Sequence, residues 1–271
     1  MKRVFPILLA VVALFGVVSC IYVSPPKVEK SDVETITKCR LISSEQMANF
    51  DAIKAKQRIS VIYSQGGKPE VRVYTDVKDS TLLNIRVEDN ELILEYKPSV
   101  KRIDESVHTI VEVSGYNVND FDVTSGAEIE LKEAYVTTGE VELEGSSSGR
   151  IIFLNLKADK VNAKVSSGAE VRFEGVVREL EAEASSGAAI NVPNITAEEI
   201  SADASSGAGI HLKGTATRVS YEASSGASLK AGDLAAEKGE VKASSGASVK
   251  ANVKYLTQKT SSGASLQNVI R

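Results

Sequence analysis

Apolar and polar residues alternate along short stretches of the chain from Phe50 to about residue 115. A period of two residues places every second side chain on one face, which is typical of β-strands with a single buried face. Turns are indicated at Gly66-Gly67 and, most tightly, at Asp89-Asn90. We therefore predict a β region over residues 48–115 with no helix of normal length, and an edge strand ahead of it within residues 35–42. The alternating positions are Ile59, Val61 and Tyr63; Val71 and Val73; Leu83, Ile85 and Val87; Leu92, Leu94 and Tyr96; and Ile110, Val111 and Val113.

The tetrapeptide Ser-Ser-Gly-Ala recurs through the second half of the sequence. Six perfect copies and two degenerate ones, Thr124-Ser125-Gly126-Ala127 and Ser147-Ser148-Gly149-Arg150, follow one another with glycine spacings of 17 to 23 residues. So short a period is typical of stacked structural repeats rather than of separate domains. Glycine supplies the backbone angles of a sharp corner, and we expect the serine hydroxyls to bond from one repeat to the next. The predicted corner glycines are Gly126, Gly149, Gly168, Gly187, Gly207, Gly226, Gly246 and Gly263.

Within the repeats, apolar positions fall into columns. The fifth residue after each glycine is apolar in all but the last repeat, and the fourth is mostly polar. One repeat cannot bury such a face alone, whereas repeats stacked about 4.8 Å apart bury all of them and pair their backbones. The third residue after each glycine is apolar throughout: Ile129, Ile152, Val171, Ile190, Ile210, Leu229, Val249 and Leu266.

These columns predict an all-β fold in which residues 116–271 form a single-chain parallel β-helix, or solenoid, of about seven or eight short rungs. Each rung is expected to hold two or three short strands joined by corners. The filled apolar columns argue against a disordered Gly/Ser-rich array, and the period of two excludes a helical solenoid. The corner chemistry leaves the handedness of the coil open. Because the last repeat, with Leu266 and Ile270, has no evident polar cap, we also predict end-to-end self-association.

The N-terminal segment has the pattern of an export signal. Lys2 and Arg3 precede an uninterrupted apolar run over residues 4–18, which is too short to span the hydrocarbon core of a bilayer. We predict a signal peptide over residues 1–19, in preference to a short buried helix, because the run lies at the extreme N-terminus behind two basic residues.

The end of this segment, Val17-Val18-Ser19-Cys20, resembles a bacterial lipobox, which implies acylation of Cys20 as a membrane anchor. Residues 20–47, with Pro25-Pro26 and alternating charges, are the expected tether. With Cys20 acylated, Cys39 has no partner in the chain and is interpreted as a small buried hydrophobe. A reactive or cross-linking thiol, or a disulfide to an unacylated Cys20, stays an alternative.

Composition narrows the classes of partner. The formal net charge is −4, and removal of Lys2 and Arg3 with the signal peptide gives −6. We exclude nucleic acid as a partner because it requires concentrated basic surface, and no run of Lys or Arg indicates a peripheral membrane patch. Tryptophan is absent and aromatic residues make up 5% of the chain, so stacking platforms for sugars are sparse.

We find no catalytic, cofactor-binding or metal-binding constellation. His108 and His211 lack Cys, His or Glu at metal-ligand spacing, and the repeated serines lack a single distinguished nucleophile with its base. Carboxylates at corresponding rung positions could form an acidic column, and paired carboxylates act as acid and base in glycosidases or bind Ca²⁺. We favour a solvated strand face interleaved with Lys164 and Lys242. The carboxylates in question are Glu181, Glu183, Asp203, Glu222 and Glu240.

The chain resembles the family of autotransporter-adhesin head domains, or GIN domains, of Bacteroidetes over roughly residues 48–271. The resemblance rests on Phe50-Asp51-Ala52-Ile53, the strand and turn over residues 59–67, the segment 87–94 and the Ser-Gly-Ala rungs. It implies a right-handed β-helix-like fold and an envelope location, and brings no catalytic residues. Surface-exposed lipoproteins of this group carry acidic residues after the lipidated cysteine, whereas Ile21-Tyr22-Val23-Ser24 stand here. This difference favours the periplasmic leaflet of the outer membrane.

We therefore expect a cell-envelope lipoprotein with a non-enzymatic binding or structural module that presents a long, flat β surface to a glycan or protein partner. The alternative is a carbohydrate-active enzyme, a polysaccharide lyase or a glycosidase, on the same scaffold. Clustered aromatic residues and asymmetrically placed carboxylates would favour the enzyme, whereas the observed uniform rungs favour the binding module.

Overall fold

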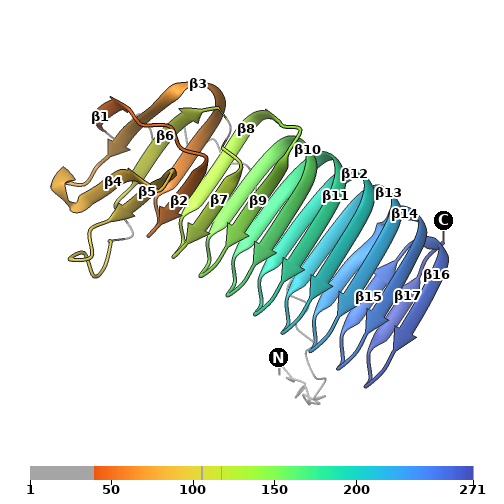
Figure 1. Cartoon of the computed structure of the whole chain (residues 1–271). Helices are drawn as coiled ribbons and strands as arrows, with labels where there is room; N and C mark the ends of the chain where they lie inside the picture. The colour runs from red at the N-terminus through yellow and green to blue at the C-terminus, as the bar shows by residue number, and fades with distance from the viewer. Residues whose placement is uncertain (1–39, 105, 117, 271) are drawn as a thin grey trace, which may run out of the picture.

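The protein forms a long coil of parallel strands that carries an irregular group of strands at one end (Figure 1). This computed structural model describes residues 40–104, 106–116 and 118–270. All seventeen strands of these residues belong to one sheet, and the 3-10 helix η1 (Ser80–Leu82) is the only helix among them. The described part of the chain thus holds no helix that could span a bilayer. The predicted all-β solenoid is confirmed, whereas the signal peptide, Cys20 and Cys39 lie outside the described residues.

The first strands form the irregular group. Strand β3 reverses at Gly66 and Gly67, so that β6 lies between its two halves: residues 60–65 pair with 110–115, and residues 70–75 pair with 114–109. Asp89 and Asn90, with φ of 51° and 65°, close the predicted tight reversal between β4 and β5. The strands are β1 (Arg40–Gln46), β2 (Ala52–Lys56), β3 (Ser60–Thr75), β4 (Leu83–Glu88), β5 (Glu91–Tyr96) and β6 (Thr109–Gly115). Within the described residues, strand β1 pairs only with β3 and is therefore an edge strand, and it lies wholly inside the segment 20–47 that we assigned to the tether.

The remaining strands build the coil. Strands β10 to β14 each make a whole rung, and their pairing falls into three segments separated by bends: in β10, residues 150–153, 156–158 and 160–165 pair with β11. The strands are β7 (Asp120–Thr124), β8 (Glu128–Val136), β9 (Glu140–Gly145), β10 (Arg150–Val165), β11 (Glu170–Ala184), β12 (Ala189–Ala204), β13 (Gly209–Ala223), β14 (Ser228–Ala243), β15 (Ser248–Ala251), β16 (Val253–Thr260) and β17 (Ser265–Asn268).

Each corner is a tight turn whose two central residues have left-handed backbone angles. In the corner 185–188, Ser186 and Gly187 have φ of 52° and 72°, and the amide of Ala188 donates to the carbonyl of Ser185 at 3.0 Å. Positive φ at both central positions defines a type I′ turn. The amide of Gly187 then donates to the carbonyl of Ser206 in the next rung at 3.2 Å. The backbone therefore joins successive corners, and an expected serine hydroxyl bond between repeats is also present, from Ser146 Oγ to Thr124 Oγ1 at 3.0 Å.

Gly149 was assigned wrongly as a corner glycine. In that rung Ser147 and Ser148 take the two left-handed positions, with φ of 49° and 64°. Gly149 occupies the following buried position, where a Cβ would lie 2.7 Å from the carbonyl oxygen of Val123. The register consequently places Ile151 and Phe153 inside the coil, so the predicted inward position of Ile152 is wrong by one residue.

With Ser148 in place of Gly149, the rung length alternates. Successive corners from Ser148 to Gly246 are separated by 20, 19, 20, 19 and 20 residues. The shorter rungs have a glycine at the central bend, Gly175 and Gly214, directly beside Leu156 and Ile195 of the preceding rung. A Cβ on either glycine would lie within 2.0 Å of the neighbouring carbonyl oxygen. The shorter rung therefore makes its bend only because the backbones can approach closely.

The stack of corners begins before the first Ser-Gly-Ala segment. Gln57 and Arg58 have φ of 57° and 63°, and the amide of Arg58 donates to the carbonyl of Ser125 in the next corner at 3.1 Å. Strand β2 and the start of β3, which flank this corner, stack in parallel on β7 and β8. The boundary that we predicted at residue 116 therefore does not mark the start of the coil, because a rung of residues 52–62 already belongs to it.

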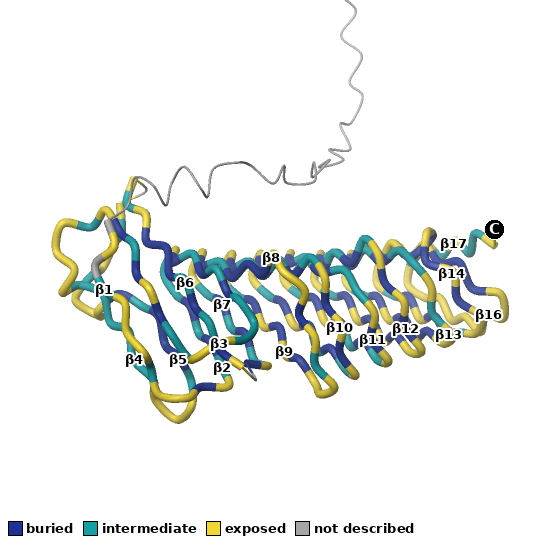
Figure 2. Tube along the Cα trace, turned by 90° about the horizontal axis from the view of Figure 1, so that it is seen from above, coloured by how far each residue is buried: buried dark blue, intermediate teal, exposed yellow. Residues whose placement is uncertain are grey.

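One continuous core runs from Phe50 to Val253, and Figure 2 shows buried segments along the whole length of the coil. At the N-terminal end it is aromatic: the ring of Phe121 packs edge-on against Tyr63 and Phe153, with centroid distances of 5.3 and 4.8 Å. Further along, Phe173 shares its rung with the buried Ala182. Large and small buried residues thus occur together in one rung, and the interior is close-packed as in other proteins.

The C-terminal end of the coil carries a polar cap that the sequence did not reveal. Asn268 occupies a position where earlier rungs have an apolar side chain, and its amide bonds the backbone of Val253 twice. The amide nitrogen of Val253 donates to Oδ1 at 2.9 Å, and Nδ2 donates to the carbonyl oxygen at 2.9 Å. The side chain therefore replaces the backbone of a further strand at this point.

Candidate ligand-binding groove

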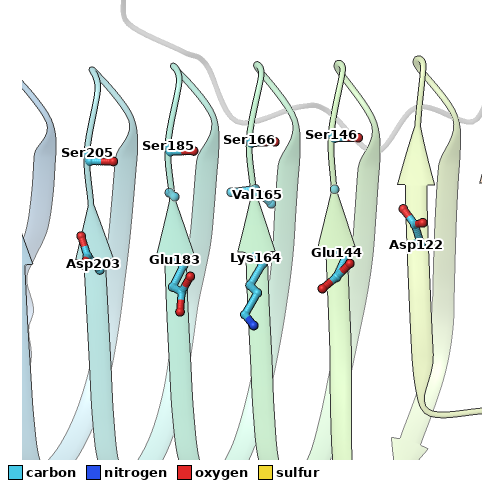
Figure 3. Close-up of a pocket in the computed structure, with 12 residues that line it drawn as sticks. Asp122, Glu144, Ser146, Lys164, Val165, Ser166, Glu183, Ser185, Asp203 and Ser205 are labelled. Atoms are coloured by element: carbon cyan, nitrogen blue, oxygen red, sulfur yellow. The ribbon is translucent and has the colours of Figure 1, made fainter.

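A polar groove crosses five rungs on the strands that precede the corners. Its volume is about 480 Å³, and we call it the acidic groove. One row of its lining consists of Asp122, Glu144, Lys164, Glu183 and Asp203, and the other of Ser146, Ser166, Ser185 and Ser205 (Figure 3). Both rows run along the axis of the coil, so the groove suits a linear ligand that crosses the strands.

The strand register places the charged row. Asp122 pairs with Glu144, Glu144 with Lys164, Lys164 with Glu183, and Glu183 with Asp203. Each residue stands two positions before the first residue of its corner, where alternation points the side chain outward. The serine row follows because each rung then enters its corner with a serine. The repeat of about twenty residues therefore places polar side chains in two parallel rows.

Burial and neighbouring acids raise the pKa of two carboxyl groups, one in the groove and one beside it. Burial, followed by the repulsion from Glu222 and Glu183, raises the pKa of Asp203. Asp120, two residues before Asp122 on β7, has its pKa raised to about 6 by burial and then by Glu142 and Glu144. The ammonium of Lys54 lies 2.5 Å from Asp122 and is the nearest compensating charge at that end.

Basic residues beside the groove are held in ion pairs. Lys160 lies 3.0 Å from Glu181 and 3.7 Å from Glu179. Lys242 lies 2.7 Å from Glu222 and 3.3 Å from Glu240. These pairs are solvent-exposed, and such pairs each contribute little to stability. They nevertheless leave Glu144, Glu183 and Asp203, which form no ion pair within the described residues, as the open acids of the groove.

The predicted acidic column is only partly formed. Glu183, Asp203 and Glu222 stand side by side in three successive rungs. Glu181 and Glu240 belong to the neighbouring column, where Ser201 and Ser220 separate them. Within the described residues, no group of three or more His, Cys, Asp or Glu side chains could hold a metal ion. The arrangement therefore offers rows of hydrogen-bond acceptors rather than a coordination sphere.

The two histidines lie in different parts of the fold. His108 is exposed just before β6, with Nδ1 at 3.3 Å from a carboxylate oxygen of Asp76. His211 is half-buried on the outward side of β13, next to Lys230 of the following rung. Sequence spacing did not reveal the residues that do line the groove at its N-terminal end, Asp122 and Glu144, because the rungs that carry them have no perfect Ser-Ser-Gly-Ala corner.

Comparison with known proteins places most of the chain in one family. The model of the family described as "Putative auto-transporter adhesin, head GIN domain" matches residues 49–210 and 185–269. No curated protein matches the chain.

Solved structures share the fold at low sequence identity. A "putative adhesin" from Parabacteroides merdae superposes with a TM-score of 0.76 at 16% identity, covering 84% of this chain and 95% of that one. A "putative adhesin" from Parabacteroides distasonis gives 0.75 at 16% identity, covering 85% and 97%. A "Putative lipid binding protein" from Parabacteroides distasonis gives 0.59 at 14% identity, covering 84% and 95%. At these identities the likeness concerns the fold alone.

Proposed function

The chain belongs to the auto-transporter adhesin head GIN domain family, and from this premise we propose that it is an exported envelope protein that binds a linear glycan, without turning it over, in the acidic groove. The observation that carries this proposal is the register of the two polar rows across five rungs. Carboxylates accept and serine hydroxyls both donate and accept hydrogen bonds, which complements the hydroxyl groups of a sugar chain.

The lining supports a glycan over the other ligand classes. Four carboxylates, four serines and one lysine offer an acyl chain little apolar surface, so the lipid-binding description of one structural relative fits this groove less well. A cationic protein segment would find the carboxylates but would leave the serine row unused. Because no aromatic residue lines the groove, binding is expected to rest on hydrogen bonds and to be weak for short oligosaccharides.

The uniformity of the rows supports binding without catalysis. Hydrolysis of a glycosidic bond requires two carboxyl groups with different roles, one protonated and one ionised. In the groove, Glu183 and Asp203 occupy equivalent positions in successive rungs, and the serines of the second row repeat in the same way. Although burial and neighbouring acids raise the pKa of Asp203, no second carboxyl group of the groove stands apart from the repeat as its nucleophile, which is why we favour the binding module over a lyase or glycosidase.

Glycan arrays and calorimetry on the full chain test the proposal. The double variant Glu183→Gln/Asp203→Asn should lose binding at least tenfold, because both substitutions remove charge-assisted acceptors. The matched control Glu198→Gln/Glu237→Gln removes the same charge from exposed positions outside the groove and should bind as the wild type does. Equal binding by the two double variants would exclude the groove, and release of shorter sugars by the wild type would show an enzyme instead.

Attachment to the membrane is the second part of the proposal. We infer that Cys20 is acylated and that the lipid holds the protein at the periplasmic leaflet of the outer membrane. The lipobox-like Val17-Val18-Ser19-Cys20 and the absence of acids directly after it support this inference. Radiolabelled fatty acid should enter the wild type and not Cys20→Ala. Protease added to intact cells should leave the protein whole; digestion under those conditions would place it at the cell surface.

A further inference from the structure

A second polar surface lies on the strands that follow the corners, at the C-terminal half of the coil. His211, Lys230 and Lys250 pair in register on β13, β14 and β15, and Lys213 points outward two residues beyond His211. Ser228 and Ser248 form the neighbouring column. We call these six residues the basic strip. The four basic residues come from three rungs, so they do not form a run of basic residues in the sequence.

The lysines of the basic strip are not neutralised within the described residues. On the strands that precede the corners, Lys160, Arg218 and Lys242 all form ion pairs with carboxylates. Lys213, Lys230 and Lys250 form none in the described part of the chain. Since they are mostly exposed, they are available to an external anion.

Positive charges stand next to one another in this strip, and their repulsion destabilises the protein when no anion is bound. Lys230 and Lys250 are direct neighbours in adjacent strands, where equal charges are destabilising. Partial burial, followed by Lys213 and Lys230, lowers the pKa of His211, and Asp233 opposes this shift. A bound anion would relieve the repulsion between Lys230 and Lys250.

The backbone beneath the strip accommodates the lysine stem. A Cβ on the buried Gly232 would lie 2.9 Å from Cε and 3.0 Å from Cγ of Lys250. The stem of Lys250 therefore packs across this glycine, which restricts the positions that its ammonium can take.

The distribution of charge along the chain also favours an anion at this end of the coil. Residues 209–271 contain nine Lys or Arg and four Asp or Glu, whereas residues 120–208 contain seven Lys or Arg and seventeen Asp or Glu.

We propose that the basic strip binds a linear acidic glycan that runs along the coil, with its carboxylates over Lys213, Lys230 and Lys250 and its hydroxyls on Ser228 and Ser248. The strip is flat and repeats with the rungs, as a linear polymer requires. Ser228 and Ser248 stand beside the lysines and Asp233 pairs in register with Lys213, so the strip has no apolar anchor for a bilayer. This site goes beyond the acidic groove and does not depend on it, because the two surfaces share no residue.

Polygalacturonate and its methyl ester, which lacks the charges, serve as probes for the full chain. The triple variant Lys213→Gln/Lys230→Gln/Lys250→Gln should lower the affinity for polygalacturonate about tenfold or more, since each exposed charge pair contributes up to about a factor of five. The wild type should bind the methyl ester at least tenfold more weakly, and its binding of polygalacturonate should weaken as salt is raised.

A matched control carries the same loss of charge elsewhere. Lys68, Lys78 and Lys101 are exposed in the irregular N-terminal group, and their replacement by Gln should leave the affinity within twofold of the wild type. An equal loss in both triple variants would overturn the strip in favour of net charge alone. Capture of phosphatidylglycerol vesicles without binding of polygalacturonate would overturn the glycan in favour of a membrane. The groove variant Glu183→Gln/Asp203→Asn should still bind polygalacturonate, which separates this proposal from the proposed function.

Discussion

Four glycine-to-alanine substitutions distinguish the destabilisation caused by backbone strain from the destabilisation caused by steric contact between rungs. Gly187 has a left-handed φ of 72° and no atom within 4 Å of the position of a Cβ. Gly175 is the reverse case: its φ is not left-handed, but a Cβ would lie 1.8 Å from the carbonyl oxygen of Leu156. Gly214 combines a φ of 128° with a Cβ position 2.0 Å from the oxygen of Ile195. Gly209 has neither constraint and serves as the control.

The magnitudes follow from these contacts. Alanine at Gly187 should cost about 1–2 kcal/mol, the penalty of a left-handed residue with a side chain. Alanine at Gly175 forces two rungs apart at the bend, so two or three ladder hydrogen bonds worth about 1 kcal/mol each are lost, with overpacking in addition. We expect about 3 kcal/mol there and about 4–5 kcal/mol at Gly214, where both penalties apply. Gly209→Ala should be neutral or stabilise slightly.

Urea unfolding followed by circular dichroism ranks the variants, and the expected order of destabilisation is Gly209, Gly187, Gly175, Gly214. Because neighbouring rungs stabilise one another, the midpoint of each transition is the quantity to compare. If Gly187→Ala destabilises as much as Gly214→Ala, close approach at the bends is not what distinguishes short rungs from long ones. A neutral Gly175→Ala would contradict the alternation of 19 and 20 residues as a consequence of the bend.

Three further predictions concern single side chains. Tyr221→Phe should be neutral or stabilising, because the buried hydroxyl has no hydrogen-bond partner in the described structure. Tyr63→Phe should instead lower the free energy of unfolding by about 1 kcal/mol, because it removes the 2.8 Å hydrogen bond to the carbonyl of Gly115. Thermal denaturation of both variants tests the pair. The pKa of Asp120 is raised to about 6, so the folded state binds more protons than the unfolded state between pH 4 and 6, and the free energy of unfolding should fall as pH rises through that window. Asp120→Asn should remove this fall and raise the free energy of unfolding by about 1 kcal/mol at pH 7. Urea unfolding at a series of pH values measures both effects. Asn268→Leu should expose the backbone of Val253 and raise self-association in sedimentation velocity, and a wild-type sedimentation pattern would show that the cap is dispensable.

The repeat made the fold predictable, but the register inside the repeat depended on which residues stand at the corners. The apolar columns identified the interior because alternation is a direct consequence of strand geometry. The error at Gly149 arose because Ser148 adopts a left-handed angle that we had reserved for glycine. The corner at Gln57 and Arg58 could not be predicted for the same reason, because neither residue is typical of a type I′ turn. The stacking of the backbone on the next corner holds both residues at left-handed angles.

The surfaces were less accessible to sequence reasoning than the core. A column across rungs joins residues about twenty positions apart, and an error of one residue moves a side chain to the opposite face. The acidic groove needed the true register at Glu144 and Lys164, next to the corner that had been misplaced. The basic strip needed the absence of ion pairs at Lys230 and Lys250 in the described structure, a property of side-chain geometry that no spacing encodes.

A coil of this kind separates folding from binding. The interior columns and the corner turns fix the position of every rung, and the outward positions between them contribute little to the core. Lys164 stands between Glu144 and Glu183 in the groove, while Lys230 and Lys250 stand together in the strip, although all five occupy equally regular outward positions. Because the register presents such positions about 4.8 Å apart, one substitution per rung is enough to change the charge sequence that a linear ligand meets. Under both proposals, the differences between rungs at these positions, and not the repeat itself, would determine which ligand is bound.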